Sequence, residues 1–439
     1  MMQTKAVGTL VSGCLAVAVA WGMGIQGAVA QDAAKASRVP GLDDRRAESI
    51  DIQHIFNAMQ KGDLEAVADI YKASSDAATH VVAAMVIERM HDNLDASTRD
   101  AQTCEDSLID TRPGIALMCG QFASGNLRLA GRDADAMDKE AALIKRFEGH
   151  GLDRQIAGMK TFAQHGAKRF ALSIDKPKTA VTVALIDQEH RNSPYFKITA
   201  NSHNIEAMLD TGANDFVVGD AQARDLGVEI VDDKAMFGGW LSHGIQGKHG
   251  LLKELRLGNI TWHNVPVLVV PRQITLIGVN LVAPLGTVRV SKDKLTISPD
   301  GESGQPTCTS PMLIASTFWG ESMKLMPQLQ IEDQWQSVML DTGSHRYLLG
   351  TPEALKQATA LHRGKELMGD IGGTHEANTR SAKIKLTISN QPFEVYFDVL
   401  TDSQMAWPIT LGAGALRDMD FVLDFKNQHL CFPLHEHLR

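Results

Sequence analysis

Two carboxylates stand in the same local sequence at widely separated places in the chain. Asp210 begins an Asp-Thr-Gly triplet within Glu206–Val218, EAMLDTGANDFVV, and Asp341 begins another within Ser337–Leu349, SVMLDTGSHRYLL. In each copy an apolar run containing Met-Leu precedes the aspartate, and a second apolar run follows the triplet. One such triplet arises by chance far more often than two with the same flanks. We therefore interpret the copies as one motif that the chain uses twice.

Two carboxylates that face each other are suited to general acid–base catalysis. Like charges at close range do not both ionise cheaply, so such a pair shares one proton and titrates with separated apparent pKa values. The ionised member removes a proton from a water molecule, and the protonated member donates to a substrate carbonyl. Water is then the nucleophile, and the chemistry requires no metal and no organic cofactor. Asp210 and Asp341 are the predicted catalytic residues.

Each triplet predicts a strand that runs into a tight turn. Gly212 and Gly343 allow backbone torsions that other residues resist, so each aspartate is expected at a strand end. Short apolar runs of period 2, separated by Asn and Asp, surround both triplets and predict further strands. Two glycine-rich stretches, 236–240 and 369–373, follow the triplets at corresponding places. They predict either ordinary hairpins or mobile loops that close over a ligand.

The chain before these β units has a different pattern. Segments such as Asp51–Tyr71 carry apolar residues at helical spacing, with Gly and Asp between the segments. About six helices are expected, with a weak similarity to tetratricopeptide-type helical hairpins, because the repeat does not align with itself. Two interpretations stay open for this region: a module that binds a protein partner, or a helical packing domain. The predicted divisions are a signal peptide over 1–30, a flexible lead-in over 31–44, a helical domain over 45–172, β lobes over 178–298 and 312–433, and a linker over 299–311.

The first thirty residues predict export. They hold one Lys, an apolar centre and Ala-Val-Ala before Gln31, which is typical of a secretory signal cut after Ala30. A retained membrane anchor fits less well, because small residues dilute the segment and no second apolar run of spanning length occurs. The sequence Val-Ser-Gly-Cys ending at Cys14 also resembles the lipid-attachment box of bacterial lipoproteins. Secretion or a periplasmic location is predicted, with lipidation at Cys14 as the alternative.

The composition and charge of the chain favour a globular protein that binds neither nucleic acid nor metal. The chain has 439 residues with 44% hydrophobic and 22% charged, which fits a globular protein of two or three domains. Its net charge of −9 is unfavourable for nucleic acid, since phosphate binding requires a basic face. His435 and His437 lack a third ligand at the usual spacing, so no metal site is predicted.

Four cysteines remain after removal of residues 1–30, an even number for a chain that reaches an oxidising compartment. We predict the pairs Cys104–Cys119 and Cys308–Cys431, although spacing alone does not fix connectivity.

Both β units resemble the lobes of aspartic proteases, and their short length and glycine-rich loops are most similar to the retropepsin branch. The resemblance covers about residues 178–433 and rests on three elements in each half: an apolar run with Asp-Thr-Gly, a flap hairpin, and an apolar-apolar-Gly segment at 276–278 and 410–412. It implies an α+β multidomain chain, with an all-α domain before two tandem all-β lobes. Because one chain supplies both halves, it also implies a monomeric endopeptidase that acts on a peptide or protein substrate.

The resemblance also implies roles for the residues around the aspartates. The active-site loops are Thr211, Gly212 and Ala213 in the first lobe and Thr342, Gly343 and Ser344 in the second, with the threonines bonded across the interface. The flap and substrate-binding residues are Gly238, Gly239, Trp240, Ile371, Gly372 and Gly373, although neither flap has a Tyr at a pepsin-like position. The flaps are expected to add an extended peptide as a strand. Two alternatives stay open: an inactive peptide-binding protein of this fold, and a helical scaffold for a protein partner.

Overall fold

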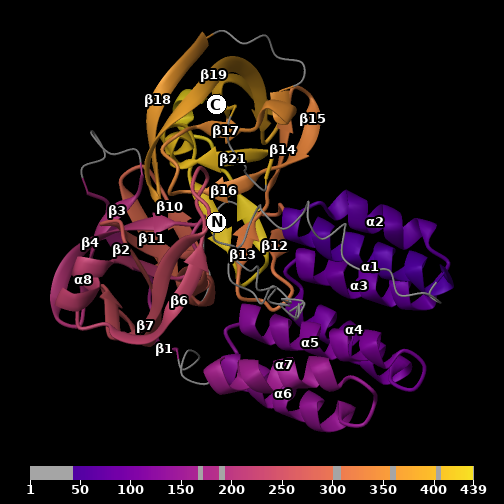
Figure 1. Cartoon of the computed structure of the whole chain (residues 1–439). Coiled ribbons are helices and arrows are strands. Elements are labelled where there is room, and N and C mark those ends of the chain that lie inside the picture. Colours follow the sequence, from indigo (N-terminus) through magenta and orange to yellow (C-terminus); the bar gives the residue numbers. More distant parts are fainter. Residues whose placement is uncertain are drawn as a thin grey trace, which may run out of the picture.

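The computed structural model describes residues 43–166, 172–186, 193–299, 308–355, 362–401 and 407–438. The predicted signal peptide over 1–30 and the alternative lipidation site at Cys14 lie outside these residues. Figure 1 shows a helical region beside two β-rich lobes, with the helices contacting the lobes along one side. The predicted α+β class, a helical region followed by two β-rich lobes, is confirmed.

Short polar caps and glycines separate the helices. Gly62 has a φ of +71° and ends the first helix, and the Asp63 carboxylate accepts a hydrogen bond from the Ala66 N–H at the start of the second. Asp76 caps the third helix in the same way through the Thr79 N–H. The helices are α1 (Asp43–Lys61), α2 (Leu64–Ala73), α3 (Ala77–Met90), α4 (Leu94–Leu108), α5 (Pro113–Leu129), α6 (Asp133–Phe147) and α7 (Asp153–Gly166).

Seven helices, rather than about six, occupy this region of the described chain. The apolar pattern over 136–162 is interrupted at Gly149 and Gly151, which have φ values of +85° and +73°. A left-handed backbone at these two positions is incompatible with a continuous α-helix, so the segment folds as α6 and α7.

The two lobes share the order of the strands around the triplets, but their remaining elements differ. In the first lobe the elements are β1 (Ser173–Asp175), β2 (Val181–Ala184), β3 (Tyr195–Ala200), β4 (His203–Asp210), β5 (Phe216–Gly219), α8 (Asp220–Asp225), β6 (Glu229–Phe237), β7 (Ile245–Leu257), β8 (Ile260–Val270), β9 (Thr275–Gly278), α9 (Val279–Val282), η2 (Ala283–Leu285), β10 (Thr287–Val290) and β11 (Lys294–Ser298). In the second they are β12 (Ile314–Ser316), β13 (Met323–Leu325), β14 (Gln328–Ile331), β15 (Gln334–Ser337), β16 (Met339–Asp341), β17 (Leu348–Gly350), η3 (Pro352–Leu355), β18 (His362–Asp370), β19 (Gly373–Ile388), β20 (Gln391–Leu400), β21 (Ile409–Gly412), η4 (Ala413–Arg417), β22 (Phe421–Asp424), β23 (His429–Cys431) and η5 (Glu436–Leu438).

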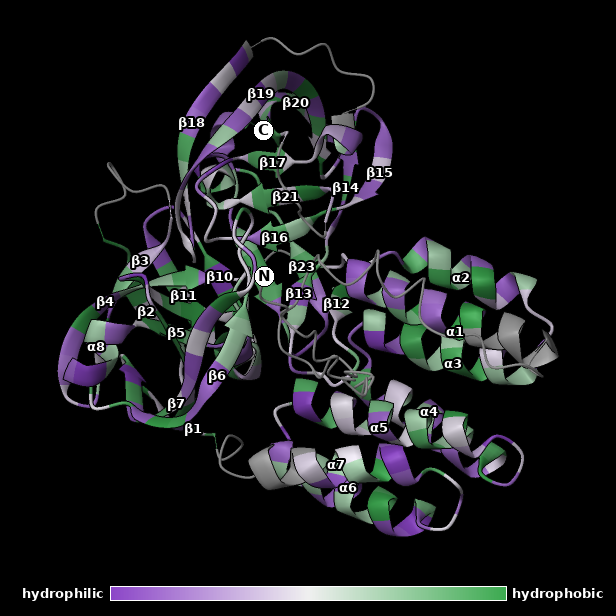
Figure 2. Cartoon of the chain, in the orientation of Figure 1, coloured by the Kyte–Doolittle hydropathy of each residue, from purple (hydrophilic) through white to green (hydrophobic). Residues whose placement is uncertain are grey.

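Strand pairing is equivalent in the two lobes. The aspartate-bearing strands β4 and β16 pair in parallel with β9 and β21, and β5 and β17 pair antiparallel with the same strands. The long hairpins β6–β7 and β18–β19 project from each lobe. In Figure 2 the central strands of both lobes are mainly green, whereas β18 contains purple segments. The lobes thus present their aspartates from matching positions on two similar sheets.

A five-stranded sheet joins the lobes. Its order is β2-β11-β10-β22-β23, and β10 of the first lobe pairs antiparallel with β22 of the second over Thr287–Val290 and Phe421–Asp424. The side chains of Val288, Phe421 and Leu423 are buried there, in one core cluster that extends through both lobes. This shared core fixes the spacing of the lobes, because burying apolar side chains is the main favourable term in folding.

The helical region docks on the loop between β12 and β13. Arg89 of α3 is fully buried and donates to the backbone oxygens of Thr317 and Phe318 at 3.1 and 3.0 Å. The Phe318 ring packs between Phe56 and Phe122, with centroid distances of 5.1 and 5.8 Å. The helices therefore hold the β12–β13 hairpin from outside. Within the described ranges no helix has the length and apolar character needed to cross a membrane.

Candidate active site

Asp210 and Asp341 lie at the ends of β4 and β16. In each lobe the aspartate carboxylate accepts hydrogen bonds from the two backbone N–H groups that follow the threonine. Asp210 Oδ1 accepts from Gly212 and Ala213 at 2.8 and 3.1 Å. Asp341 Oδ1 accepts from Gly343 at 2.9 Å and from Ser344 at 3.3 Å. These bonds fix the direction of each carboxylate through the turn that its own triplet forms.

The two turns face each other. A Cβ atom placed on Gly212 would lie 2.7 Å from the carboxylate of Asp341, and one on Gly343 would lie 2.5 Å from the carboxylate of Asp210. Both distances are shorter than any ordinary carbon contact. Neither glycine has a left-handed backbone, so the close approach of the opposite aspartate, rather than the predicted torsions of the turn, requires glycine at these positions.

Thr211 and Thr342 connect the turns beneath the carboxylates. The Thr211 hydroxyl accepts from the Thr342 N–H at 3.1 Å and donates to the Leu340 oxygen at 2.8 Å. The Thr342 hydroxyl accepts from the Thr211 N–H at 3.1 Å and donates to the Leu209 oxygen at 2.7 Å. Both threonines are fully buried. The cross-lobe contact implied by the family resemblance is thus present and symmetric.

The buried carboxyl of Asp341 favours its protonated form. Burial raises the pKa of Asp341 well above its ordinary value, and the negative charge of Asp210 and a hydrogen bond between the two carboxyls raise it further. The Gly343 N–H and the Lys324 ammonium oppose this rise. A pair of this kind holds one proton over a wide range of pH.

Three polar residues beneath the turns were not identified from the sequence. Lys324 of β13 is only 6% exposed, and its Nζ donates to the Gly212 oxygen at 2.6 Å and to Asn214 Oδ1 at 2.8 Å. On the other side, Ser193 Oγ donates to the Gly343 oxygen at 3.5 Å. The strand Met323-Lys324-Leu325 has no sequence pattern that predicts a contact with the active-site turn. Asn214 could have been identified, because it is a polar residue that directly follows Asp-Thr-Gly-Ala.

The predicted flap residues lie at the tips of the hairpins, and the tips contact each other. Gly238, Gly239 and Trp240 belong to the loop between β6 and β7. Ile371 and Gly372 join β18 to β19, and Gly373 is the first residue of β19. Asp370 Oδ2 accepts from the N–H groups of Leu241 and Ser242, both at 2.9 Å. Asp370 Oδ1 accepts from the Ser242 hydroxyl at 2.7 Å.

Further groups complete this contact. His375 Nε2 lies 2.6 Å from the Ser242 hydroxyl, and the Arg272 guanidinium donates to the backbone oxygens of Asp370 and Gly373. Burial would raise the pKa of Asp370, but the hydrogen bonds from Ser242, Leu241 and Gly372 outweigh it and lower the pKa. We call this group, Asp370 with Leu241, Ser242 and His375, the flap clasp.

Each flap tip also packs against the apolar side chains of the opposite lobe. Ile371, from the second flap, packs with the first-lobe cluster of Met208, Val217, Phe237, Val270 and Leu276. Trp240, from the first flap, packs with a second-lobe cluster that includes Met339 and Trp407. The clasp and these reciprocal contacts hold the two hairpin tips against each other and against the opposite lobes.

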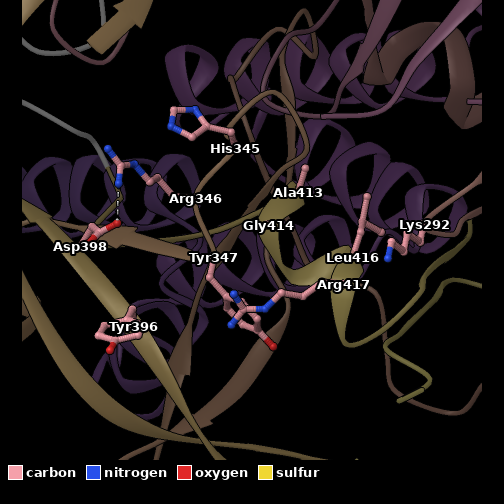
Figure 3. Close-up of a pocket in the computed structure, with 10 residues that line it drawn as sticks. All are labelled: Lys292, His345, Arg346, Tyr347, Tyr396, Asp398, Ala413, Gly414, Leu416 and Arg417. Atoms are coloured by element: carbon pink, nitrogen blue, oxygen red, sulfur yellow. Dashed lines mark hydrogen bonds and ion pairs between the residues drawn. The ribbon is translucent and has the colours of Figure 1, made fainter. Parts of the chain in front are cut away.

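The residues after the second triplet line a cavity of about 290 Å³ (Figure 3). Arg346 reaches Asp398 at 3.0 Å and also pairs with Glu366, and the Arg417 guanidinium lies 4.9 Å from the centre of the Tyr347 ring. Burial and the charge of Arg346 lower the pKa of His345. The first lobe has Asn214 and Asp215 at the corresponding positions, so the surroundings of the two turns differ in charge.

Four of the cysteines form two disulfides. The structure has a disulfide between Cys104 and Cys119, which joins α4 to α5, and one between Cys308 and Cys431, which ties the chain before β12 to β23. In the ranges described, no three His, Cys, Asp or Glu side chains gather as metal ligands. Disulfides are compatible with an extracellular or periplasmic protein.

Comparison with known proteins supports the resemblance. Residues 196–281, which include the first triplet and the first flap, match the family of aspartyl proteases. The predicted resemblance to retropepsin-like and pepsin-like proteases is thereby confirmed. No protein with a curated description matches this chain.

Three solved structures show similarity at low identity. A retropepsin-like aspartic protease from Rickettsia conorii is 20% identical, with 29% of this chain and 92% of that chain covered and a TM-score of 0.22. Basic 7S globulin from soybean is 11% identical, with 58% and 96% covered and a TM-score of 0.33. The aspartic proteinase from Irpex lacteus is 15% identical, with 58% and 98% covered and a TM-score of 0.38.

Proposed function

We propose that this chain is a single-chain aspartic endopeptidase in which Asp210 and Asp341 form one catalytic site. The observation that carries the proposal is the mutual packing of the turns: each glycine lies against the carboxylate of the other lobe. Neither lobe alone completes this arrangement. A carboxyl pair that shares a proton is the chemistry that such an arrangement supports best.

Hydrolysis follows from the two protonation states. Asp210, as carboxylate, removes a proton from a water whose oxygen bonds to the peptide carbonyl carbon, while Asp341 gives its proton to the carbonyl oxygen. In the tetrahedral intermediate the proton on Asp210 passes to the amide nitrogen, and the C–N bond breaks. A hydroxyl proton of the intermediate returns to Asp341, which leaves an acid and an amine and restores the enzyme. The raised pKa of Asp341 supports its role as the acid.

Substrate entry requires the flaps to open. Ile371 and Trp240 occupy apolar surfaces beside the aspartates, so a peptide side chain that enters either surface displaces a flap tip. The backbone of the flap hairpins then offers hydrogen-bonding groups to an extended peptide. Gly238, Gly239, Gly372 and Gly373 leave room for that approach, since they carry no side chains.

The helical region is proposed to remain part of the working protein as a single monomeric chain. Arg89 and Phe318 join it to the β12–β13 hairpin, and that hairpin carries Lys324 to the Asp210 turn. A segment with fully buried contacts of this kind is a poor candidate for removal by processing. The proposed domains are 45–172, 178–298 and 312–433. The proposed location is secreted or periplasmic, and the helices are proposed to restrict or recruit protein substrates.

The test uses the whole chain from residue 31. Incubation with a diverse peptide pool from pH 3 to pH 8, followed by mass mapping of the cuts, should reveal endoproteolytic products. The Asp341→Asn protein is the matched control, because Asn keeps the shape of Asp without its proton chemistry. Peptides that bind but stay intact in both proteins would overturn the proposal in favour of a binding protein. Products of equal yield in both would assign the cleavage to a contaminant.

A further inference from the structure

Lys324 occupies a position where a buried cation is costly. Its side chain is only 6% exposed, and the two acceptors in contact with the ammonium are the Gly212 carbonyl and the Asn214 side-chain oxygen, at 2.6 and 2.8 Å. Ser322 Oγ donates to the same Asn214 oxygen at 3.1 Å, which holds that acceptor in place. Taking an ammonium out of water costs several kcal/mol unless nearby negative charge compensates.

The compensating charges are the site's own carboxylates. Burial lowers the pKa of Lys324, whereas the negative charges of Asp210, Asp341 and Asp215 raise it. These three carboxyls are the charged groups that face the ammonium from β4, β16 and the turn after the first triplet. The ammonium in turn is the cation that opposes the raised pKa of Asp341.

The contact to the Gly212 carbonyl reaches Asp210 through one peptide group. That carbonyl and the Ala213 N–H belong to the same peptide unit, and the Ala213 N–H donates to Asp210 Oδ1 at 3.1 Å. An ammonium on the oxygen of a peptide group polarises it and strengthens the N–H as a donor, because hydrogen bonds in a chain reinforce one another. The Asp210 carboxylate is therefore stabilised in its ionised form.

The second lobe has a weaker version of the same series of hydrogen bonds. The Gly343 carbonyl accepts from the neutral Ser193 hydroxyl at 3.5 Å, and the Ser344 N–H in that peptide unit donates to Asp341 Oδ1 at 3.3 Å. Both contacts are longer than those in the first lobe, and the donor carries no charge. Charge-assisted hydrogen bonds are about twice as strong as neutral ones.

We propose that Lys324 is a positioning residue that assigns the two roles in the catalytic pair, holding Asp210 as the ionised base and leaving Asp341 as the protonated acid. The inference rests on the proposed function for its use in catalysis. The assignment of charge, however, concerns the carboxyls whether or not the chain cleaves peptides.

The first experiment needs no activity. Carboxyl carbons are followed by ¹³C NMR against pH in Asp341→Asn, where Asp210 remains, and in Asp210→Asn, where Asp341 remains. These two titration curves are the reference for the next experiment, because burial alone already raises the pKa of Asp341 and their difference therefore does not isolate the effect of Lys324.

The second experiment removes the charge. Lys324→Met in the Asp341→Asn protein should raise the pH at which Asp210 ionises by about one unit, whereas Ser193→Ala in the Asp210→Asn protein should move Asp341 by less than half as much. In the otherwise unchanged chain, Lys324→Met should move the acid limb of kcat/KM upward by a similar amount, and Lys324→Arg should restore it. A lowered kcat with an unmoved acid limb would give Lys324 a structural role only. No change in the titration of Asp210 on loss of the Lys324 charge would overturn the proposal. If Lys324→Met does not fold, Lys324→Gln, which removes the charge but keeps a donor for the Gly212 oxygen, takes its place in both measurements.

Discussion

The two lobes are near copies where the chemistry is symmetric and differ where it is not. The triplets, the buried threonines and the facing glycines form equivalent contacts in both lobes. Directly beneath and after the triplets the lobes diverge: Lys324 contacts the first turn and Ser193 the second, and Asn214-Asp215 corresponds to His345-Arg346. Two matched turns bring the carboxyls together to share a proton, whereas unequal surroundings favour one carboxyl as the acid and the other as the base.

The two flaps also combine a common architecture with different residues at their tips. Both are hairpins, but β6 and β7 are joined by the loop 238–244, whereas Ile371 and Gly372 alone join β18 to β19. Only the second flap supplies the acceptor, Asp370, and only the first supplies the Leu241 and Ser242 donors. The contact between the tips is therefore asymmetric, since the first tip donates and the second accepts.

The largest expected effect comes from the aspartates, where the lobes are equivalent. Asp210→Asn and Asp341→Asn should each lower kcat for peptide cleavage by at least about 10³-fold, because each removes one partner of a shared proton. The double variant should be no worse than either single one, since residues that act as a unit are strongly non-additive. Steady-state kinetics of the three variants measures kcat, and circular dichroism shows whether each variant is folded. Substantial activity in one single variant would mean that the turns serve separate sites.

The facing glycines test the symmetry of the packing. Gly212→Ala and Gly343→Ala place a methyl group 2.7 and 2.5 Å from the opposite carboxylates, so each should lower kcat by about 10²-fold through misplacement of the reacting groups. Gly114→Ala is the control, because no atom lies within 4 Å of the added carbon. A full-rate enzyme with Ala at either position would contradict the close approach of the two turns.

The clasp tests the asymmetry of the flaps. Asp370→Ala removes the acceptor of the Leu241 and Ser242 amides, so hydrogen exchange at these amides should accelerate by about tenfold or more, given the strength of hydrogen bonds to charged groups. Glu376→Ala, on the exposed pair with Lys365, is the control and should leave exchange at the tips unchanged. Tip amides that exchange equally in both variants would show that the apolar contacts alone hold the flaps.

The flap clasp should be stable over a pH range that the ionisation of Asp370 sets. The pKa of Asp370 is lowered in the folded protein, so its contribution to stability is present above the unfolded value of about 3.8 and is lost as the pH falls through the lower folded value. Exchange at the tips, corrected for intrinsic rates, should therefore be the same at pH 5 and pH 7. Opening of the tips between these values would mean that a group other than Asp370 controls the clasp.

The smallest expected effect concerns stability. The folded-state pKa of Asp341 lies above its unfolded value of 3.8, so the free energy of unfolding falls as the pH rises through that interval. Asp341→Asn removes this dependence and should raise Tm at pH 7 more than at pH 4, by about 2–4 °C for each kcal/mol relieved. Asp210→Asn should keep part of the slope, because Asp341 stays buried. Calorimetry at both pH values measures the difference. Asp341 is buried whereas Asp210 is only partly buried, so equal slopes in the two variants would contradict this account.

Local sequence determined the elements of this protein. Glycine-punctuated apolar runs predicted the strands around both triplets, and the confirmed α+β class followed from the change of period between the helical and β regions. The placement of Asp210 and Asp341 at strand ends needs only their own turns, since each carboxylate bonds to N–H groups two and three residues later. Their role in catalysis stays a prediction.

Tertiary structure alone decided which side chains act on those turns. Lys324 and the Gly212 carbonyl are 112 residues apart, and the Ser242 and Asp370 of the flap clasp are 128 apart. A Lys between Met and Leu has the pattern of an ordinary strand residue, and the β12–β13 hairpin, held by Arg89 from 228 residues away, is what buries it against the Asp210 turn. Periodicity reports which face of an element is buried, but the partner on that face depends on how distant elements pack.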